Sequence, residues 1–277
     1  MIELPRVEAL RYLQPLREGG SLPAVVETTD GLYVVKFRGA GQGPRALISE
    51  LVAGLIALEL GLPVPAPALV ELPDGFGADQ PDPEIRELVT ASHGVNVGLR
   101  YLDGAFNYDA RAAGDLISAD LASDVGWFDA FLTNPDRTPR NPNLMVWERR
   151  PWLIDHGSAL YAHHNWSDVD ETRTRTPFPL IRDHVLLLKA TDLGETDARR
   201  SATLTPDRLA AVMDAVPDAL LMDPLARGAF ASADEARARY TRYLVERLAP
   251  PRPFVGEIER SQAARRAEPM KRLEARR

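Results

Sequence analysis

Short apolar runs separated by turn residues dominate the first hundred positions of the chain. Two of these runs flank the pair Asp30-Gly31, an arrangement typical of a β-hairpin. Pro44 is placed to begin a helix that Gly61 would end, because proline is favoured in the first helical turn and glycine just past the last. The predicted strands are residues 9–15, 22–28, 32–37, 68–72 and 95–102. The pattern therefore predicts a β-rich first part built around one helix, residues 44–60.

The apolar spacing changes beyond residue 103. Residues 115–133 carry apolar side chains at close to a 3.6-residue period, which predicts a helix. A polar loop, residues 134–143, separates this helix from a predicted short hairpin with strands at 144–147 and 152–154. Further helices are predicted at residues 179–189, 206–215 and 234–249. The whole chain is thus predicted to have an α+β fold.

These patterns divide the chain into three predicted parts. Residues 1–103 form a small β-rich lobe, residues 104–250 a larger helical lobe, and residues 251–277 a basic tail. The tail has eight Lys or Arg against four Asp or Glu, although the net charge of the chain is −7. We expect a solvated helix or a frayed end there, and the alternative is a contact with a partner or regulator.

The composition excludes several classes of protein. The chain has 45% hydrophobic and 26% charged residues, as in an ordinary globular protein, and its longest apolar run is too short to cross a bilayer. A net charge of −7 argues against direct binding of nucleic acid by the domain. The absence of cysteine excludes a disulfide scaffold and a cysteine nucleophile, and it predicts a cytoplasmic protein.

Lys36 is one of only three lysines among 33 basic residues, and it lies in the apolar run Tyr33-Val34-Val35-Lys36-Phe37. An unpaired ammonium group is costly inside an apolar strand, so the lysine either reaches water from an edge strand or has an acidic partner. Glu50, which interrupts an apolar face of the predicted helix, is the candidate partner. A strand lysine paired with a helix glutamate binds phosphate oxygens in kinases.

The polar loop contains Asp136 and Asn141, five positions apart. Kinase catalytic loops use this spacing, because the aspartate faces the acceptor hydroxyl while the asparagine turns back to hold magnesium. The alternative is a turn rich in proline and asparagine that has no chemical role. Asp155 ends an apolar strand fourteen residues after Asn141, so a hairpin can bring both side chains to one Mg²⁺ ion.

Two further groups of residues give weaker signals. The turn Gly19-Gly20-Ser21 lies before Lys36 where a phosphate-covering loop belongs, and its backbone amides could bind phosphate. It lacks three spaced glycines, so a plain hairpin turn is an equal alternative. His163 and His164 lack the spacing of zinc ligands, and no zinc site is predicted there.

In these residues the chain resembles the HipA-like kinases, a branch of the protein-kinase-like fold that is related to phosphatidylinositol kinases. The motifs that carry the resemblance are Tyr33-Val34-Val35-Lys36-Phe37, Asn134-Pro135-Asp136-Arg137, Asn141-Pro142-Asn143 and Ile154-Asp155-His156-Gly157. Residues 93–98 are also similar to the stretch that joins the lobes and lines the adenine pocket in kinases. The resemblance implies a bilobal protein-kinase-like fold with a β-rich N-lobe and a mostly helical C-lobe.

The resemblance also implies a role for each candidate residue. Lys36 would hold the α- and β-phosphates of ATP with Glu50 as its partner, and Asp136 would orient or deprotonate the acceptor hydroxyl. Asn141 and Asp155 would bind Mg²⁺, with Asn143 as the alternative to Asn141. The implied nucleotide-binding residues are Gly19, Gly20, Ser21, Lys36, Val97 and Asn141.

The activity that the resemblance implies is ATP- and Mg²⁺-dependent phosphorylation of Ser or Thr hydroxyls in a protein. Two alternatives use the same residues. One is a kinase of a small molecule or a lipid headgroup, because the fold does not fix the acceptor. The other is a nucleotide-binding pseudokinase scaffold, against which the competent residue types at all five key positions argue.

Overall fold

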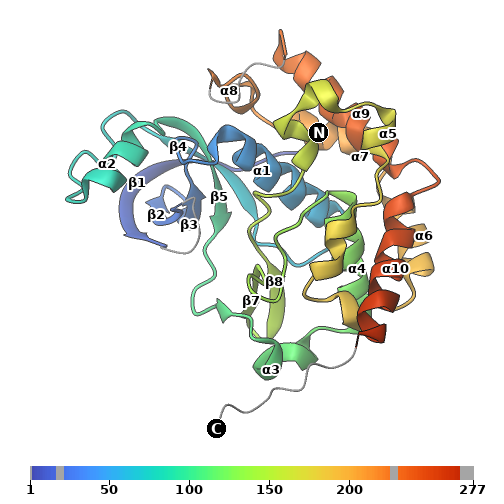
Figure 1. The fold of residues 1–277 in the computed structure, drawn as a ribbon. Helices are drawn as coiled ribbons and strands as arrows, with labels where there is room; N and C mark the ends of the chain where they lie inside the picture. The colour runs from blue at the N-terminus through green and yellow to red at the C-terminus, as the bar shows by residue number, and fades with distance from the viewer. Residues whose placement is uncertain (1, 17–21, 225–229, 269–277) are drawn as a thin grey trace.

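The computed structural model describes residues 2–16, 22–224 and 230–268. Within these ranges a closed β-barrel is followed by a mostly helical part that also holds a small sheet (Figure 1). The mixture of strands and helices predicted from the sequence is confirmed. The turn predicted to cover a phosphate, Gly19-Gly20-Ser21, lies outside the described residues.

Five strands close the barrel in the order β1-β2-β3-β5-β4. Their bounds are β1 Arg6–Pro15, β2 Ala24–Thr28, β3 Gly31–Lys36, β4 Pro67–Leu72 and β5 Gly94–Arg100. β1 and β4 are parallel, and the other neighbouring strands are antiparallel. Closure gives each strand two partners and buries an apolar core of its own, which includes Tyr12, Val35 and Phe37. All five strands predicted in this part are confirmed.

Helix α1, Gly43–Glu59, lies between the barrel and the helical part (Figure 1). Pro44 occupies its first turn, and Gly61 follows its end with a φ of +67°, which suits glycine. Thirteen of its seventeen residues are buried. Its apolar side chains belong to the core of the helical part and not to the core of the barrel. α1 is therefore enclosed on nearly all sides, unlike a surface helix with one apolar stripe.

The helical part packs around α4, Ala119–Phe131, whose N-terminus is capped by the Ser118 hydroxyl. The other α-helices in the described residues are α2 Pro83–Thr90, α3 Ala110–Ala113, α5 Glu171–Thr174, α6 Leu193–Thr203, α7 Pro206–Asp214, α8 Asp218–Leu221, α9 Ala233–Leu248 and α10 Pro253–Ala267. Short 3₁₀ turns are η1 Gly114–Leu116, η2 Tyr161–His164, η3 Trp166–Asp168, η4 Pro179–Asp183 and η5 Leu187–Lys189. In the described part of the chain, no helix is both long and apolar enough to cross a bilayer.

A three-stranded antiparallel sheet accompanies α4, with the order β6-β7-β8. Its strands are β6 Phe106–Asn107, β7 Leu144–Trp147 and β8 Arg150–Leu153. The predicted hairpin after the polar loop is therefore confirmed, with Leu144 opposite Leu153. This register brings the residues before β7 next to the residues after β8, which include Asp155.

One predicted helix is wrong. Residues 179–189 form the two 3₁₀ turns η4 and η5, separated by residues 184–186. The Val185 amide donates to the Arg137 carbonyl, and the Leu186 amide donates to the His184 ring at 3.1 Å. Because these donors are used outside the helical i to i−4 pattern, a continuous α-helix cannot form.

The beginning of the predicted basic tail is an ordered helix. Phe254 and Ile258 of α10 are buried, and the Phe254 ring packs edge-on against Trp127 of α4. The expected solvated helix is thus solvated on one face only, because the other face completes the core of the helical part. Arg265 and Arg266 lie in its last turn, where positive charge is favourable.

Candidate active site

Lys36, the last residue of β3, forms a buried ion pair with Glu50 of α1. Lys36 Nζ donates to Glu50 Oε2 at 2.7 Å, and the Glu50 side chain is fully buried. Burial alone would raise the pKa of Glu50, but Lys36 and the hydrogen bond from His156 outweigh burial and hold that pKa far below its usual range. The partner that the sequence predicted for Lys36 is therefore in place.

Asp155 meets the same lysine from the other side. Lys36 Nζ lies 2.5 Å from Asp155 Oδ1, although the two residues are 119 positions apart. Burial would lower the pKa of Lys36, but the attraction of Glu50 and Asp155 outweighs burial and raises it above its usual range. The Asp155 side chain is 40% exposed, so a ligand can still reach it.

The backbone turns sharply at Asp155. Its φ is +53°, in the left-handed region that few residue types other than glycine and asparagine or aspartate adopt. The next amide, that of His156, donates to Glu50 Oε2 at 2.8 Å. The buried Glu50 carboxylate thus helps to hold the turn, and the turn presents the Asp155 carboxylate to Lys36.

Asp136 lies in the loop between α4 and β7, where two amides face its carboxylate. Asn141 Nδ2 donates to Asp136 Oδ2 at 3.0 Å, and Asn143 Nδ2 donates to the same oxygen at 3.2 Å. Both asparagines named from the sequence are thus brought to the predicted catalytic aspartate. They differ in position, because Asn141 is exposed while Asn143 is buried directly before β7.

The structure also relates Asn143 to Asp155. The Ile154 amide donates to the Asn143 carbonyl at 3.1 Å, so Asn143 is paired with the residue that precedes Asp155. Because the Nδ2 atoms of both asparagines face an acidic oxygen, their Oδ1 atoms point the other way. Amide and carboxylate oxygens fit a hard cation such as Mg²⁺, which keeps several waters and few protein ligands. Within the described residues, no group of three or more His, Cys, Asp or Glu side chains could hold a metal by itself.

Val97 of β5 lies opposite Lys36 in the barrel register. Its side chain is 1% exposed and belongs to the same core as α1. Paired residues of neighbouring strands point to the same face, so Val97 shares the face of Lys36. Because the side chain offers almost no surface to a ligand in this structure, the adenine contact stays a prediction.

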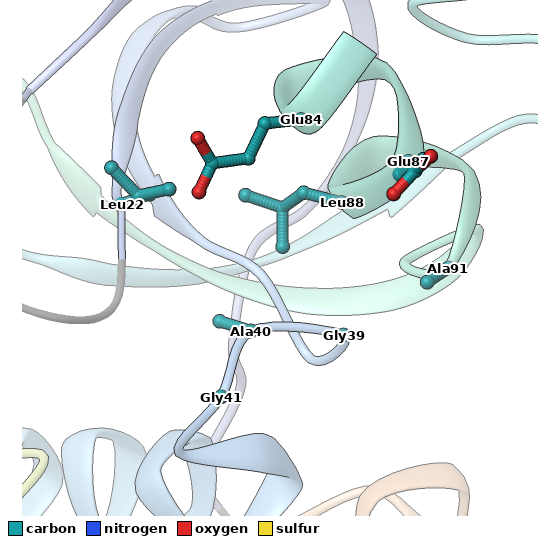
Figure 2. Close-up of a pocket in the computed structure, with 8 residues that line it drawn as sticks. All are labelled: Leu22, Gly39, Ala40, Gly41, Glu84, Glu87, Leu88 and Ala91. Carbon is teal, nitrogen blue, oxygen red and sulfur yellow. The ribbon is translucent and has the colours of Figure 1, made fainter.

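A separate cavity of about 360 Å³ lies between α2 and the loop after β3 (Figure 2). It is lined by Leu22, Gly39, Ala40, Gly41, Glu84, Glu87, Leu88 and Ala91. The Glu84 carboxylate points into the space between Leu22 and Leu88 (Figure 2). Carboxylates repel phosphate, so this cavity does not suit the phosphates of a nucleotide.

Two residues around the site escaped prediction. His156 contacts Glu50 through its amide and its ring, and Asp129 of α4 is a fully buried carboxylate that binds Arg137 in the predicted catalytic loop. The available signal for Asp129 was its place between Phe128 and Ala130 in an apolar run, where an acidic residue is costly unless it is paired.

A barrel strand lysine, its buried helix partner and an aspartate just after a later strand are arranged as in a kinase, and the comparisons with known proteins agree. The model of the HipA-like kinase family matches residues 11–174, more than half of the chain. The chain belongs to the HipA-like kinases.

One similar solved structure is that of the Helicobacter pylori proinflammatory kinase CtkA. The TM-score is 0.57 at 12% sequence identity, and the match covers 96% of this chain and 100% of that chain. At this identity the likeness concerns the fold. No curated protein matches the chain in sequence.

Proposed function

We propose that the chain is a bilobal, ATP- and Mg²⁺-dependent kinase that phosphorylates Ser or Thr hydroxyls of a protein. The observation that carries the proposal is the 2.5 Å contact between Lys36 Nζ and Asp155 Oδ1. One nucleotide must meet both its phosphate-binding lysine and its metal ligand, so these side chains have to be neighbours. A chain without cysteine fits the cytoplasm, which is the proposed location.

Each residue has one task in the proposed reaction. The Lys36 ammonium binds the phosphate oxygens of ATP, and Glu50 keeps this ammonium aimed and charged. The Asp136 carboxylate accepts the proton of the acceptor hydroxyl as that oxygen bonds to the γ-phosphorus. The bond from the γ-phosphorus to the β–γ bridging oxygen breaks, and ADP leaves. Asp155 and Asn141 or Asn143 would hold Mg²⁺, which neutralises phosphate charge.

Incubation with labelled ATP and Mg²⁺, alone and with a cell lysate, tests this function. Label in a protein band that disappears with the variant Asp136→Ala supports the proposal. Label that appears only in a soluble metabolite or in a lipid extract would show that the acceptor is a small molecule or a headgroup. Failure to bind ATP by calorimetry in the presence of Mg²⁺ would contradict nucleotide-dependent chemistry altogether.

The two asparagines can be separated by matched substitutions. Asn143→Gly is expected to raise the Mg²⁺ concentration needed for half-maximal transfer by roughly 10- to 100-fold, the usual cost of disturbing a metal site. Asn141→Gly is expected to change it by less than about 3-fold, because Asn141 is exposed and is not paired with the strand that leads to Asp155. Glycine suits position 143, where φ is +48°. The reverse order of effects would assign the metal to Asn141.

A further inference from the structure

Arg137 follows the predicted catalytic aspartate but points into the protein. The side chain of Arg137 and the carboxylate of Asp129 that it binds are both fully buried. Arg137 Nε donates to Asp129 Oδ2 at 2.6 Å, and Nη2 lies 3.4 Å from Oδ1. One edge of the planar guanidinium therefore faces both oxygens of the carboxylate. This contact fixes the orientation of the guanidinium, which a single contact from a lysine ammonium would not do.

The third nitrogen of this guanidinium reaches the two strands that lead to the site. Arg137 Nη1 donates to the carbonyl of Asn143 and lies 3.4 Å from the carbonyl of Ile154. Asn143 contacts the Asp136 carboxylate, and Ile154 immediately precedes Asp155. One buried side chain therefore joins helix α4, the start of β7 and the residue before Asp155.

Asp129 reaches Asp136 by a second route. Asn134 Nδ2 donates to Asp129 Oδ1 at 2.9 Å, and Asn134 Oδ1 accepts the Asp136 amide at 3.2 Å. The catalytic loop is thus tied to α4 on both sides of Asp136, through Asn134 before it and through Arg137 after it.

His184 completes the set of donors around Asp129. Its Nε2 lies 3.0 Å from Asp129 Oδ2, while its Nδ1 accepts the Leu186 amide. Because Nδ1 is an acceptor, Nε2 carries the proton and donates to the carboxylate. Burial would raise the pKa of Asp129, but Arg137 and His184 outweigh it and keep the group ionised. Both oxygens of the Asp129 carboxylate therefore accept hydrogen bonds, and the carboxylate holds the Arg137 guanidinium in one position.

We propose that Arg137 is a positioning residue for phosphoryl transfer. Anchored by Asp129, it sets the spacing between the base Asp136 and the metal-binding residues around Asp155. This inference rests on the proposed function, because it explains what holds Asp136 and the residues around Asp155 at the spacing that phosphoryl transfer needs. Lys36 and Glu50 form no contact with Arg137 or Asp129 in the described contacts, so nucleotide affinity is expected to change much less than the rate of transfer.

The test is the variant Arg137→Lys, which keeps the positive charge but removes the planar guanidinium and its several donors. We expect kcat for phosphoryl transfer to fall by roughly 10- to 100-fold while KM for ATP stays within about 3-fold, since a displacement of about 1 Å costs this much. The matched control is Arg200→Lys. Arg200 also binds an aspartate of α4, Asp124, and a backbone carbonyl, that of Leu60, without touching the site.

Hydrogen exchange gives a readout that does not depend on turnover. The amides of residues 136–143, apart from the prolines at 139 and 142, and those of residues 154–156 are expected to exchange faster in Arg137→Lys and at wild-type rates in Arg200→Lys. If Arg137→Lys does not fold, Asn134→Ala, which cuts the other route, is expected to lower kcat in the same way. A loss of kcat no larger than in Arg200→Lys, or unchanged exchange, would overturn the proposal. Absence of transfer by the wild-type protein would instead contradict the proposed function.

Discussion

Asp155→Asn is expected to lower the rate of phosphoryl transfer by about 10²- to 10³-fold, the scale on which a single electrostatic group acts in an active site. Asparagine keeps the shape of the side chain but removes the negative charge that lies 2.5 Å from Lys36 Nζ and that would bind Mg²⁺. The rate at saturating ATP measures the effect. We expect the variant to fold, because Glu50 still pairs with Lys36 and asparagine tolerates the positive φ at this position.

Asp168→Asn is the matched control for this variant. Asp168 lies in η3 with an exposed side chain whose charged partner is Arg173. Surface pairs of this kind contribute little, so its rate is expected to equal that of the wild type. An Asp155→Asn variant that keeps more than about a tenth of the wild-type rate would remove Asp155 from the metal site.

Lys36→Met is expected to abolish transfer and also to lower the free energy of unfolding at neutral pH by about 3–5 kcal/mol. The methionine leaves the fully buried Glu50 carboxylate without its cation, and removal of one partner of a buried pair is far more costly than removal of both. Denaturant titration at pH 7 measures the stability loss, and labelled ATP measures the loss of transfer.

The pH dependence of this loss has a defined sign. The pKa of Glu50 is depressed in the folded wild type, so its contribution is present above the ordinary value of 4.5 and is lost as pH falls towards the folded pKa. In Lys36→Met the attraction of the lysine is lost and only His156 still opposes burial, so the pKa of Glu50 is higher than in the wild type. The difference in unfolding free energy between wild type and variant should therefore shrink as the pH is lowered from 7 to about 4.

Lys189→Met provides the comparison, because Lys189 donates to the Gly114 carbonyl and has no acidic partner in the described contacts. Its stability loss should not change with pH in the same range. A loss in Lys36→Met that is constant between pH 4 and 7 would mean that Glu50 is not held ionised by Lys36.

The sequence was sufficient for the parts of the fold that repeat a local pattern. Alternating apolar runs located all five barrel strands, and the turn at Gly61 located the end of α1. The pair Lys36 and Glu50 was predictable because an acidic and a basic residue interrupt neighbouring apolar elements. The approach of the loop before β7 to the segment after β8 was predictable because a short hairpin joins them, and the roles of Asp136, Asn141 and Asp155 stay predictions.

Long-range partners explain what could not be predicted. Residues 179–189 look helical alone, but Val185 donates to Arg137 and His184 to Asp129, contacts that only the folded chain provides. The role of Asp129 depends on Arg137 eight residues later and His184 on another element. The burial of α10 depends on α4, whose Trp127 meets Phe254.

The enclosure of α1 has a consequence for control of the enzyme. Ser49 and Glu50 bind the segment after β8, and Arg200 and Arg208 bind the end of the helix at Leu60 and Glu59. In protein kinases the lysine–glutamate ion pair must be in place for activity, and the position of the helix that carries the glutamate controls it. Here an outward movement of α1 would expose a core, so we expect the ion pair to persist in the folded protein. Inhibitors that select a displaced helix are therefore expected to bind this protein weakly.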